Sequence, residues 1–354
     1  MSGEPIESYM SRSRHRWIAV IIIIAITIAI SAYSVCVMSF DISFSETWEY
    51  IIRHLEGIEP ENYYDRIRDE LVFYGTVPRV IAASLIGAIL GISGAVMQYC
   101  VRNPLADPYT TGISSAALFG VTISLALGIV LIPLPGKLGI VLNAFIFAMV
   151  PCILMIIISV KRKTTPTMLI LIGIAMMYIF SSFTMVLKYN AEPEVLDQII
   201  GWSIGSVSMA QWDSIPFLII ALIILLIMTV VYSGKLDVMS TGDNLATSLG
   251  ADPKRTRLIC MAVVSACTAV AVSFSGSIGF VGLVVPHVAR LFVGSRTNAL
   301  IPCSAVAGAF LLIAADTLAR SFGAGLPVGA VTAIIGSPVF LYFLVKMRTS
   351  GWGN

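Results

Sequence analysis

Charge is the property that this sequence has least of. Only 12% of its 354 residues are Asp, Glu, Lys or Arg, whereas a soluble domain carries roughly 25%. Hydrophobic residues make up 57%, and they gather in runs of about 20 residues. Because runs of that length cross a bilayer as helices, the composition excludes an ordinary soluble domain and predicts an all-α polytopic membrane protein. The net charge of +2 gives no reason to expect nucleic acid as a partner.

Motifs for several kinds of chemistry are also missing. The sequence has no GxxxxGK[ST] phosphate-binding loop, no HExxH metalloprotease motif and no paired carboxylates within an apolar run. The chain is therefore not expected to hydrolyse a nucleotide or to act as an enzyme on its own. His287 is the single histidine within an apolar run, and beside Pro286 we interpret it as a packing residue rather than a catalytic base.

Ionisable residues within the apolar runs are few. Lys188, Arg290 and Asp316 lie near the ends of runs or close to a turn. Carriers driven by proton or sodium gradients usually need charged groups near the middle of the membrane. The scarcity of such groups disfavours a secondary carrier driven by an ion gradient. An ion site made of carbonyl and hydroxyl groups would not be detected in this way, so this alternative is retained.

The six cysteines all lie in or beside apolar runs, and none shows the CxxC spacing of a metal site. We predict that they are buried small apolar residues rather than disulfide partners or metal ligands. They are Cys36, Cys100, Cys152, Cys260, Cys267 and Cys303.

The apolar runs predict about ten transmembrane helices of about 20 residues each. The eighth is broken by Gly276, Gly279 and Gly282, and a turn there is tolerated within the membrane only if protein covers its backbone. The second carries Gly87, Gly91 and further small residues that allow helices to approach closely. The predicted spans are residues 17–40, 78–100, 111–132, 138–160, 166–187, 215–232, 258–274, 275–292, 300–319 and 328–345.

These spans form one predicted domain, residues 17–348, with short tails at 1–16 and 349–354. The first run is too long for a signal peptide and lacks a small-residue cleavage site, so we expect it to be retained as a span. With ten crossings, 15 of the 22 Lys and Arg residues fall on the side of the N-terminus. The positive-inside rule then places both termini and residues 234–257 in the cytoplasm. It places the acid-rich residues 41–75 outside, where we expect short surface helices.

Residues 234–257 are the one long polar interruption in the second half of the chain. Asp243 can cap the N-terminus of a short helix, and Gly250 stands where a helix ends in a left-handed residue. The sequence Asp252-Pro253 predicts the start of a second capped helix. The first helix is expected to place Leu245, Ala246 and Leu249 on one face. The residues alone leave open whether this is a shaped docking surface or an ordinary solvated loop rich in positive charge.

Many short motifs appear in a fixed order along the chain, and together they resemble a known family. The sequence is similar to the permease subunits of ABC importers for iron–siderophore complexes, haem and cobalamin, which have the type II importer fold. The motifs are Pro78-Arg79, the glycine-rich residues 87–98, Asn103 to Pro108, Gly201-Trp202 with Gly205-Ser206, residues 242–250, Gly279 to His287, Ala315-Asp316 with Ala319-Arg320, and residues 326–338.

This resemblance implies a set of partners. Two copies of the chain would form a homodimer around a translocation pathway. Each copy would dock one ATPase subunit on the inside, and the pair would dock one substrate-binding protein outside. The chain itself would bind no cofactor and no metal, because ATP and magnesium would belong to the ATPase. The location would be the cell membrane of a prokaryote.

By the same resemblance, residues 242–257 match the helices that couple the permease to its ATPase. This sequence has Asn244 and Thr247 where the family often has Glu and Arg. The charged part of the contact is therefore expected to be reduced, and the apolar face to be its core. The implied coupling residues are Gly242, Asp243, Asn244, Leu245, Ala246, Ser248, Leu249, Gly250 and Arg255.

Two further sites rest on the resemblance. Arg79 and Arg320 are similar to arginines that meet acidic residues of the binding protein, although Thr76 stands where the family has another Arg. The alternative is that both arginines extend to the membrane surface without a partner. Thr165 and Thr167 would lie near a cytoplasmic gate of the pathway, and N-capping of a helix explains Thr165 equally well.

The substrate does not follow from this sequence, because specificity in such importers lies mainly in the binding protein. Iron chelates are the commonest substrates of the family and are the first expectation, with cobalamin next and oxyanions such as molybdate or tungstate in some members. A secondary carrier that is not coupled to ATP, and a membrane scaffold or receptor that transports nothing, are the alternative functions.

Overall fold

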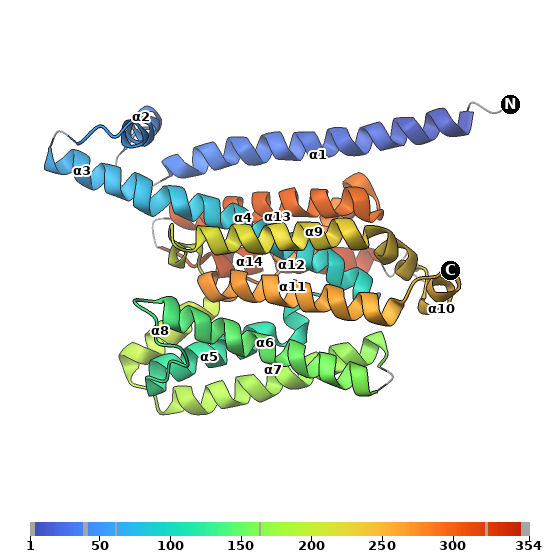
Figure 1. Cartoon of the computed structure of the whole chain (residues 1–354). Helices are drawn as coiled ribbons and strands as arrows, with labels where there is room; N and C mark the ends of the chain where they lie inside the picture. The colour runs from blue at the N-terminus through green and yellow to red at the C-terminus, as the bar shows by residue number, and fades with distance from the viewer. Residues whose placement is uncertain (1–3, 38–41, 61, 163, 323–324, 348–354) are drawn as a thin grey trace.

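Helices account for all the regular structure in the described part of the chain, which is residues 4–37, 42–60, 62–162, 164–322 and 325–347 of a computed structural model. This confirms the predicted all-α class (Figure 1). The α-helices are α1 (Glu4–Cys36), α2 (Phe44–Leu55), α3 (Tyr63–Glu70), α4 (Val77–Val101), α5 (Ile113–Leu127), α6 (Leu138–Lys161), α7 (Pro166–Tyr189), α8 (Pro193–Ile204), α9 (Ile215–Ser240), α10 (Asp243–Ser248), α11 (Pro253–Ser275), α12 (Val281–Val293), α13 (Thr297–Ser321) and α14 (Val328–Met347). Three short segments complete them: the π-helix η1 (Leu71–Thr76) and the 3₁₀ helices η2 (Pro108–Thr111) and η3 (Val207–Met209).

Ten apolar helices occur in the predicted order, but two are shorter than expected. Eight helices of the described chain are long and apolar enough to cross a membrane, and α5 and α12 are shorter apolar helices. Helix α5 is bounded by Gly112 and Gly128, both in the left-handed conformation. Helix α12 follows a break in which Phe280 has a φ of +68°. A residue in the left-handed conformation interrupts an α-helix. The backbone conformation of these few residues therefore determines where α5 and α12 begin and where α5 ends.

Some helix boundaries differ from the prediction. Helix α1 begins at Glu4, within the residues expected to form a tail, although its apolar stretch begins only at Arg16, next to the predicted start of the first span. Residues 234–240 were assigned to the polar loop, but they form the last turns of α9. Asp252 and Pro253 do begin a helix, as predicted, but it is α11 itself and not a separate short helix. The predicted tail at 349–354 lies outside the described residues.

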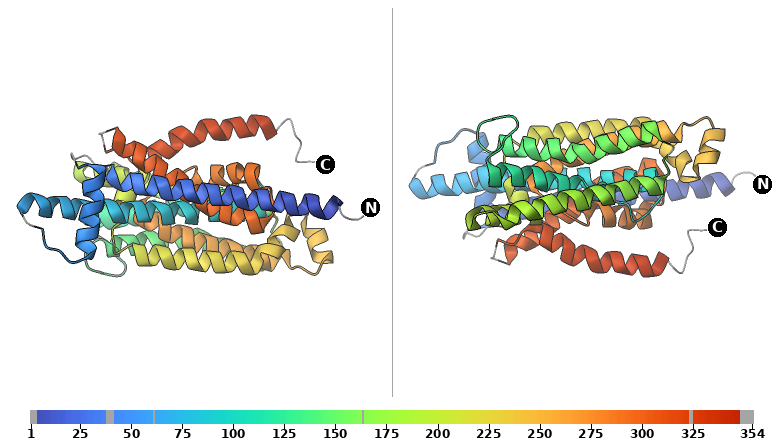
Figure 2. Two further views of the ribbon diagram at one scale, coloured as in Figure 1. Left: turned by 90° about the horizontal axis from the view of Figure 1, so that it is seen from above. Right: turned by 90° about the horizontal axis from the view of Figure 1, so that it is seen from below.

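The bundle has two ends that differ in what they carry (Figures 1 and 2). Helix α10, the beginning of α1 and the end of α14 lie at one end, which we call the α10 end. The short helices α2, α3 and α8 lie at the opposite end, the α2 end. This separation matches the grouping of segments that the Lys and Arg count predicted. Helices α2 and α3 are also the short surface helices expected within residues 41–75.

Helix α4 is the centre of the bundle. It is buried along most of its length and packs against α9, α11, α12 and α13. Its three glycines permit this, because a Cβ atom at any of them would overlap the backbone of another helix. Gly87, Gly91 and Gly94 meet the backbone of Gly308, Ser304 and Gly282, respectively. The predicted close approach of helices at these glycines is confirmed.

The break between α11 and α12 is enclosed by protein, as its position in the membrane requires. Ser206 donates its backbone N–H to the carbonyl of Ser275 at 2.7 Å, at the last residue of α11. Within the break, the backbone N–H of Ile278 donates to the Tyr109 hydroxyl at 3.3 Å. Gly276 lies against the backbone of Trp202, where no side chain would fit. Protein therefore covers the backbone of this glycine-rich turn, as the sequence analysis required of a turn within the membrane.

His287 and most of the cysteines are buried, in line with what the sequence predicts for them. Nε2 of His287 lies 2.8 Å from the carbonyl oxygen of Pro104, so this histidine joins α12 to the turn that precedes η2. All six cysteines are free; five are buried and Cys36 is half-buried.

Candidate functional site

Helix α10 is a six-residue helix whose two ends are fixed by glycines. Gly242 is its N-cap with a φ of +121°, and Gly250 follows its C-cap with a φ of +81°. At the C-terminus, Ala251 donates its N–H to the carbonyl of Ala246 and Gly250 donates to Thr247, both at 3.0 Å. This pair of bonds is a Schellman motif, which a left-handed residue makes possible. The predicted role of Gly250 is confirmed.

Asp243 is not the N-cap that the sequence predicted. It is the first residue of the helix, where a negative charge is favoured by the helix dipole. Its carboxylate is used in ion pairs instead: Oδ1 lies 2.8 Å from a guanidinium nitrogen of Arg257 and 3.8 Å from one of Arg102. Arg102 ends α4 in a left-handed conformation, with its side chain close to Gly242.

Arg257 is the residue of this site that sequence reasoning missed. Its side chain is only 5% exposed. Its Nε donates to the carbonyl of Cys100 near the end of α4, while its terminal nitrogen holds Asp243. Arg257 was counted with the solvated positive charges of the loop. Its place three residues before the apolar Cys260 on the same face of α11 was the available signal that it faces inward.

The outer surface of α10 is apolar in part. Leu245 and Leu249 are 51% and 65% exposed, while Ala246 is fully buried. The prediction that all three share one outward face was wrong, because consecutive residues of a helix point about 100° apart and Ala246 turns toward the protein. Asn244, Ser248 and Arg255 are exposed as well. The site thus presents a small apolar patch on a helix that ion pairs tie to α4 and α11.

A second cluster of charges lies at the α2 end, where Asp316 holds both arginines predicted to dock the binding protein. Arg79 donates from Nε and from a terminal nitrogen to Oδ1 of Asp316, at 2.9 and 2.7 Å. Nε of Arg320 lies 3.0 Å from Oδ2 of the same carboxylate, and its terminal nitrogens reach Ser34 and Val37. Asp316 is 1% exposed, Arg320 9% and Arg79 21%. Arg79 is therefore the more accessible of the two.

The two predicted gate residues lie where α7 begins. Thr165 is the N-cap of α7 and accepts a hydrogen bond from the backbone N–H of Met168 at 3.3 Å. Thr167 is in the first turn, and both threonines are exposed. The capping role that the sequence offered as an alternative for Thr165 is present.

Comparison with known proteins supports the resemblance over almost the whole chain. The sequence profile of the FecCD transport family matches residues 20–346. The cobalamin import system permease protein BtuC of Halobacterium salinarum is 37% identical over 276 residues, which cover 77% of this chain and 73% of that protein. The iron(3+)-hydroxamate import system permease protein FhuB of Bacillus subtilis is 34% identical over 337 residues, covering 93% and 84%.

A solved structure described as an inward-facing conformation of a metal-chelate type ABC transporter has the same fold. It superposes with a TM-score of 0.77 at 27% sequence identity, over 93% of this chain and 99% of that one.

Proposed function

Because this chain belongs to the FecCD transport family of ABC importer permeases, we propose that it forms half of a translocation pathway for a metal chelate. Relatives are named for import of cobalamin and of iron hydroxamates, so an iron–siderophore complex, haem or cobalamin is the proposed substrate class. A second copy of the chain would complete the pathway. A separate ATPase would bind ATP and magnesium and would supply the energy.

The observation that carries this proposal is the geometry of α10. A six-residue helix with two half-exposed leucines would gain little stability from its own hydrogen bonds, since isolated short helices are marginal in water. It is nevertheless fixed at both ends and anchored by the buried Arg257. A rigid apolar projection suits insertion into a cleft of a partner, where two leucines would form the centre of the contact.

The same geometry suggests how movement would pass into the membrane. A shift of α10 driven by the ATPase would be carried by the pair Asp243–Arg257 to the first turns of α11 and to the end of α4. Because α4 is packed on all sides, it would move its neighbours with it rather than bend alone. Alternating access of the pathway to the two sides of the membrane would follow.

At the α2 end, Arg79 is the proposed main contact with the acidic surface of a binding protein, with Arg320 behind it. One carboxylate holds two guanidinium groups, so the cluster keeps a net positive charge. Asp316 would fix the direction of Arg79 before the partner arrives. The acid-rich helices α2 and α3 lie at the same end and would add contacts of their own.

The test is ATP hydrolysis in lipid nanodiscs, with the chain co-expressed with the products of its neighbouring genes. Leu245→Asp and Leu249→Asp are each expected to abolish co-purification of the ATPase or chain-dependent hydrolysis, because each buries a charge in an apolar contact. Leu131→Asp is the matched control, since Leu131 is 52% exposed between α5 and α6 and belongs to neither candidate site. Full hydrolysis by both α10 variants would contradict the coupling site. Transport that follows an ion gradient without any ATPase would contradict the importer and favour a secondary carrier.

A further inference from the structure

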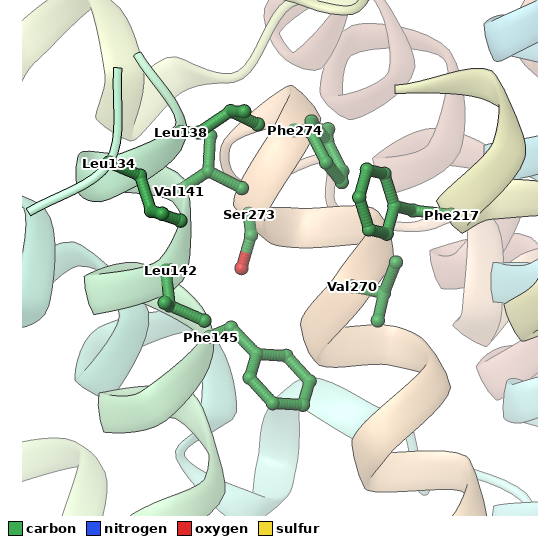
Figure 3. Close-up of a pocket in the computed structure, with 9 residues that line it drawn as sticks. All are labelled: Leu134, Leu138, Val141, Leu142, Phe145, Phe217, Val270, Ser273 and Phe274. Carbon is green, nitrogen blue, oxygen red and sulfur yellow. The ribbon is translucent and has the colours of Figure 1, made fainter. Parts of the chain in front are cut away.

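Three neighbouring cavities lie on the side of the bundle where α6 and α9 both pack against α11. They have volumes of about 260, 400 and 500 Å³. The first shares Phe145, Phe217 and Val270 with the second and Phe274 with the third, so the three lie in a row along α11, and we call this row the groove. In Figure 3, side chains of α6 such as Leu142 and Phe145 face those of α9 and α11 across the first cavity.

The groove exists because two spans pack on a third without closing over it. Among the described helices, α6 and α9 each pack extensively on α11 rather than on each other. Along α11, the half-buried residues Ala262, Ala266 and Val270 form a stripe at a spacing of four and line this gap. Small alanines make a low floor, and Phe145 and Phe217 make the walls. The only hydroxyl in the first cavity, that of Ser273, already donates to the carbonyl of Ala269.

The length of the groove matches one leaflet of a membrane. It follows α11 from Ala262 to Phe274, and this length of helix rises about 18 Å at 1.5 Å per residue. Half of the hydrocarbon thickness of a bilayer is about 15 Å. A single extended acyl chain would therefore fit along it.

The end of the groove is charged, unlike the rest. The third cavity lies toward the α2 end and is lined by Asp197 of α8, by Asp213 just before α9 and by Lys137 just before α6. All three side chains belong to exposed residues. Two carboxylates and one ammonium group complement a head group that carries one amine and one phosphate.

We propose that this groove is a binding site for an aminophospholipid of the phosphatidylethanolamine type. One acyl chain lies between α6 and α9 on the alanines of α11. The protonated amine of the head group faces Asp197 and Asp213, and the phosphate faces Lys137. The bound lipid fills the gap between the two spans and so becomes part of the packing of α11, the helix that begins beside α10.

Native mass spectrometry of the full-length chain tests this assignment. The protein is extracted in mild detergent with an equimolar mixture of phosphatidylethanolamine and phosphatidylglycerol of identical acyl chains, and the lipids that remain bound are counted. Wild type is expected to retain phosphatidylethanolamine over phosphatidylglycerol by about fivefold, the ratio expected from about 1 kcal/mol of favourable ionic contacts. Ala266→Phe fills the floor of the groove and is expected to lose the lipid.

Two control variants separate the site from general lipid contact. Val230→Phe adds the same ring to α9 at a residue that is 76% exposed and does not line the groove, so retention should be unchanged. The double change Asp197→Asn with Asp213→Asn should remove the head-group preference, whereas Glu194→Gln on the same helix α8 should not. Equal retention by the two phenylalanine variants, or equal binding of the two lipids by wild type, overturns the assignment. A third outcome also overturns the assignment: wild type retains no lipid, and Ala266→Phe loses the association between copies of the chain. That result would indicate that a helix of a second protein chain fills the groove.

Discussion

Replacing Asp243 by Asn tests whether an ion pair holds the candidate coupling helix in place. The Asp243 carboxylate lies 2.8 Å from Arg257, whose guanidinium is 5% exposed, while Asp243 itself is 35% exposed. Asn keeps the size and one acceptor oxygen of the side chain, so the change removes little more than the charge. Leaving a fully buried partner charge uncompensated costs about 3–5 kcal/mol. Since Asp243 is partly in water and its charge is screened, about 1–2 kcal/mol is expected here.

Hydrogen exchange of the α10 backbone reports this cost directly. The amides of Ala246, Leu249, Gly250 and Ala251 are all bonded within the α10 turn, so they exchange when it opens. A loss of about 1–2 kcal/mol in local stability corresponds to exchange about 5–30 times faster. The effect should be confined to peptides that cover α10 and the end of α4, with little change in the exchange of α13.

Asp252→Asn is the matched control. Asp252 caps α11 by accepting a bond from the N–H of Arg255. Asn caps nearly as well, so the helix should be retained while the net charge changes by the same amount. Wild-type exchange of α10 in Asp243→Asn would refute the bracing role of the ion pair. Equal acceleration in both variants would attribute the effect to net charge alone.

Three further changes are expected to act at sites of different kinds. Gly94→Ala should prevent close packing of α4 on α12 and sharply lower the unfolding temperature. Gly234→Ala on α9, where the new methyl group meets open space, should raise stability by up to about 1 kcal/mol. Similar unfolding temperatures of the two variants would contradict the close contact at Gly94. Asp316→Asn should lose about 3–5 kcal/mol, measured by chemical unfolding in detergent, because two arginines lose a fully buried carboxylate. Gly250→Ala should speed exchange of α10 severalfold, since a φ of +81° costs an alanine about 1 kcal/mol; an unchanged rate would contradict the Schellman end.

Local features of this fold could be predicted from the sequence, and contacts between distant segments could not. The apolar runs predicted the number and order of the apolar helices, and Gly250 and Asp252 marked helix ends because their effects reach only a few residues. Ala246 was misplaced because a six-residue helix has too few positions to define its buried face. Asp243 was assigned to the wrong role because its partner Arg257 lies beyond the turn that follows.

The candidate docking site shows the same division more strongly. Arg79 and Asp316 are 237 residues apart, and only the packing of α4 against α13 brings them together. The sequence favoured a docking role for an arginine near the start of a span, but it left extension to the membrane surface as an alternative. The buried carboxylate of Asp316 holds the guanidinium of Arg79 in one direction. The sequence pattern alone could not show this contact.

Helix α4 contacts both candidate sites, one at each of its ends. At one end of α4, Cys100 and Arg102 meet the Asp243–Arg257 pair; at the other end, Arg79 meets Asp316. The 25 residues between Val77 and Val101 form a rod of about 37 Å. Because the glycine contacts hold this rod against α12 and α13, a displacement at one end should appear at the other as a rigid-body shift. A binding protein seated on Arg79 would then alter exchange in α10 about 37 Å away. Loss of that response in Gly94→Ala, measured below the unfolding temperature of this variant, would identify α4 as the element that carries it.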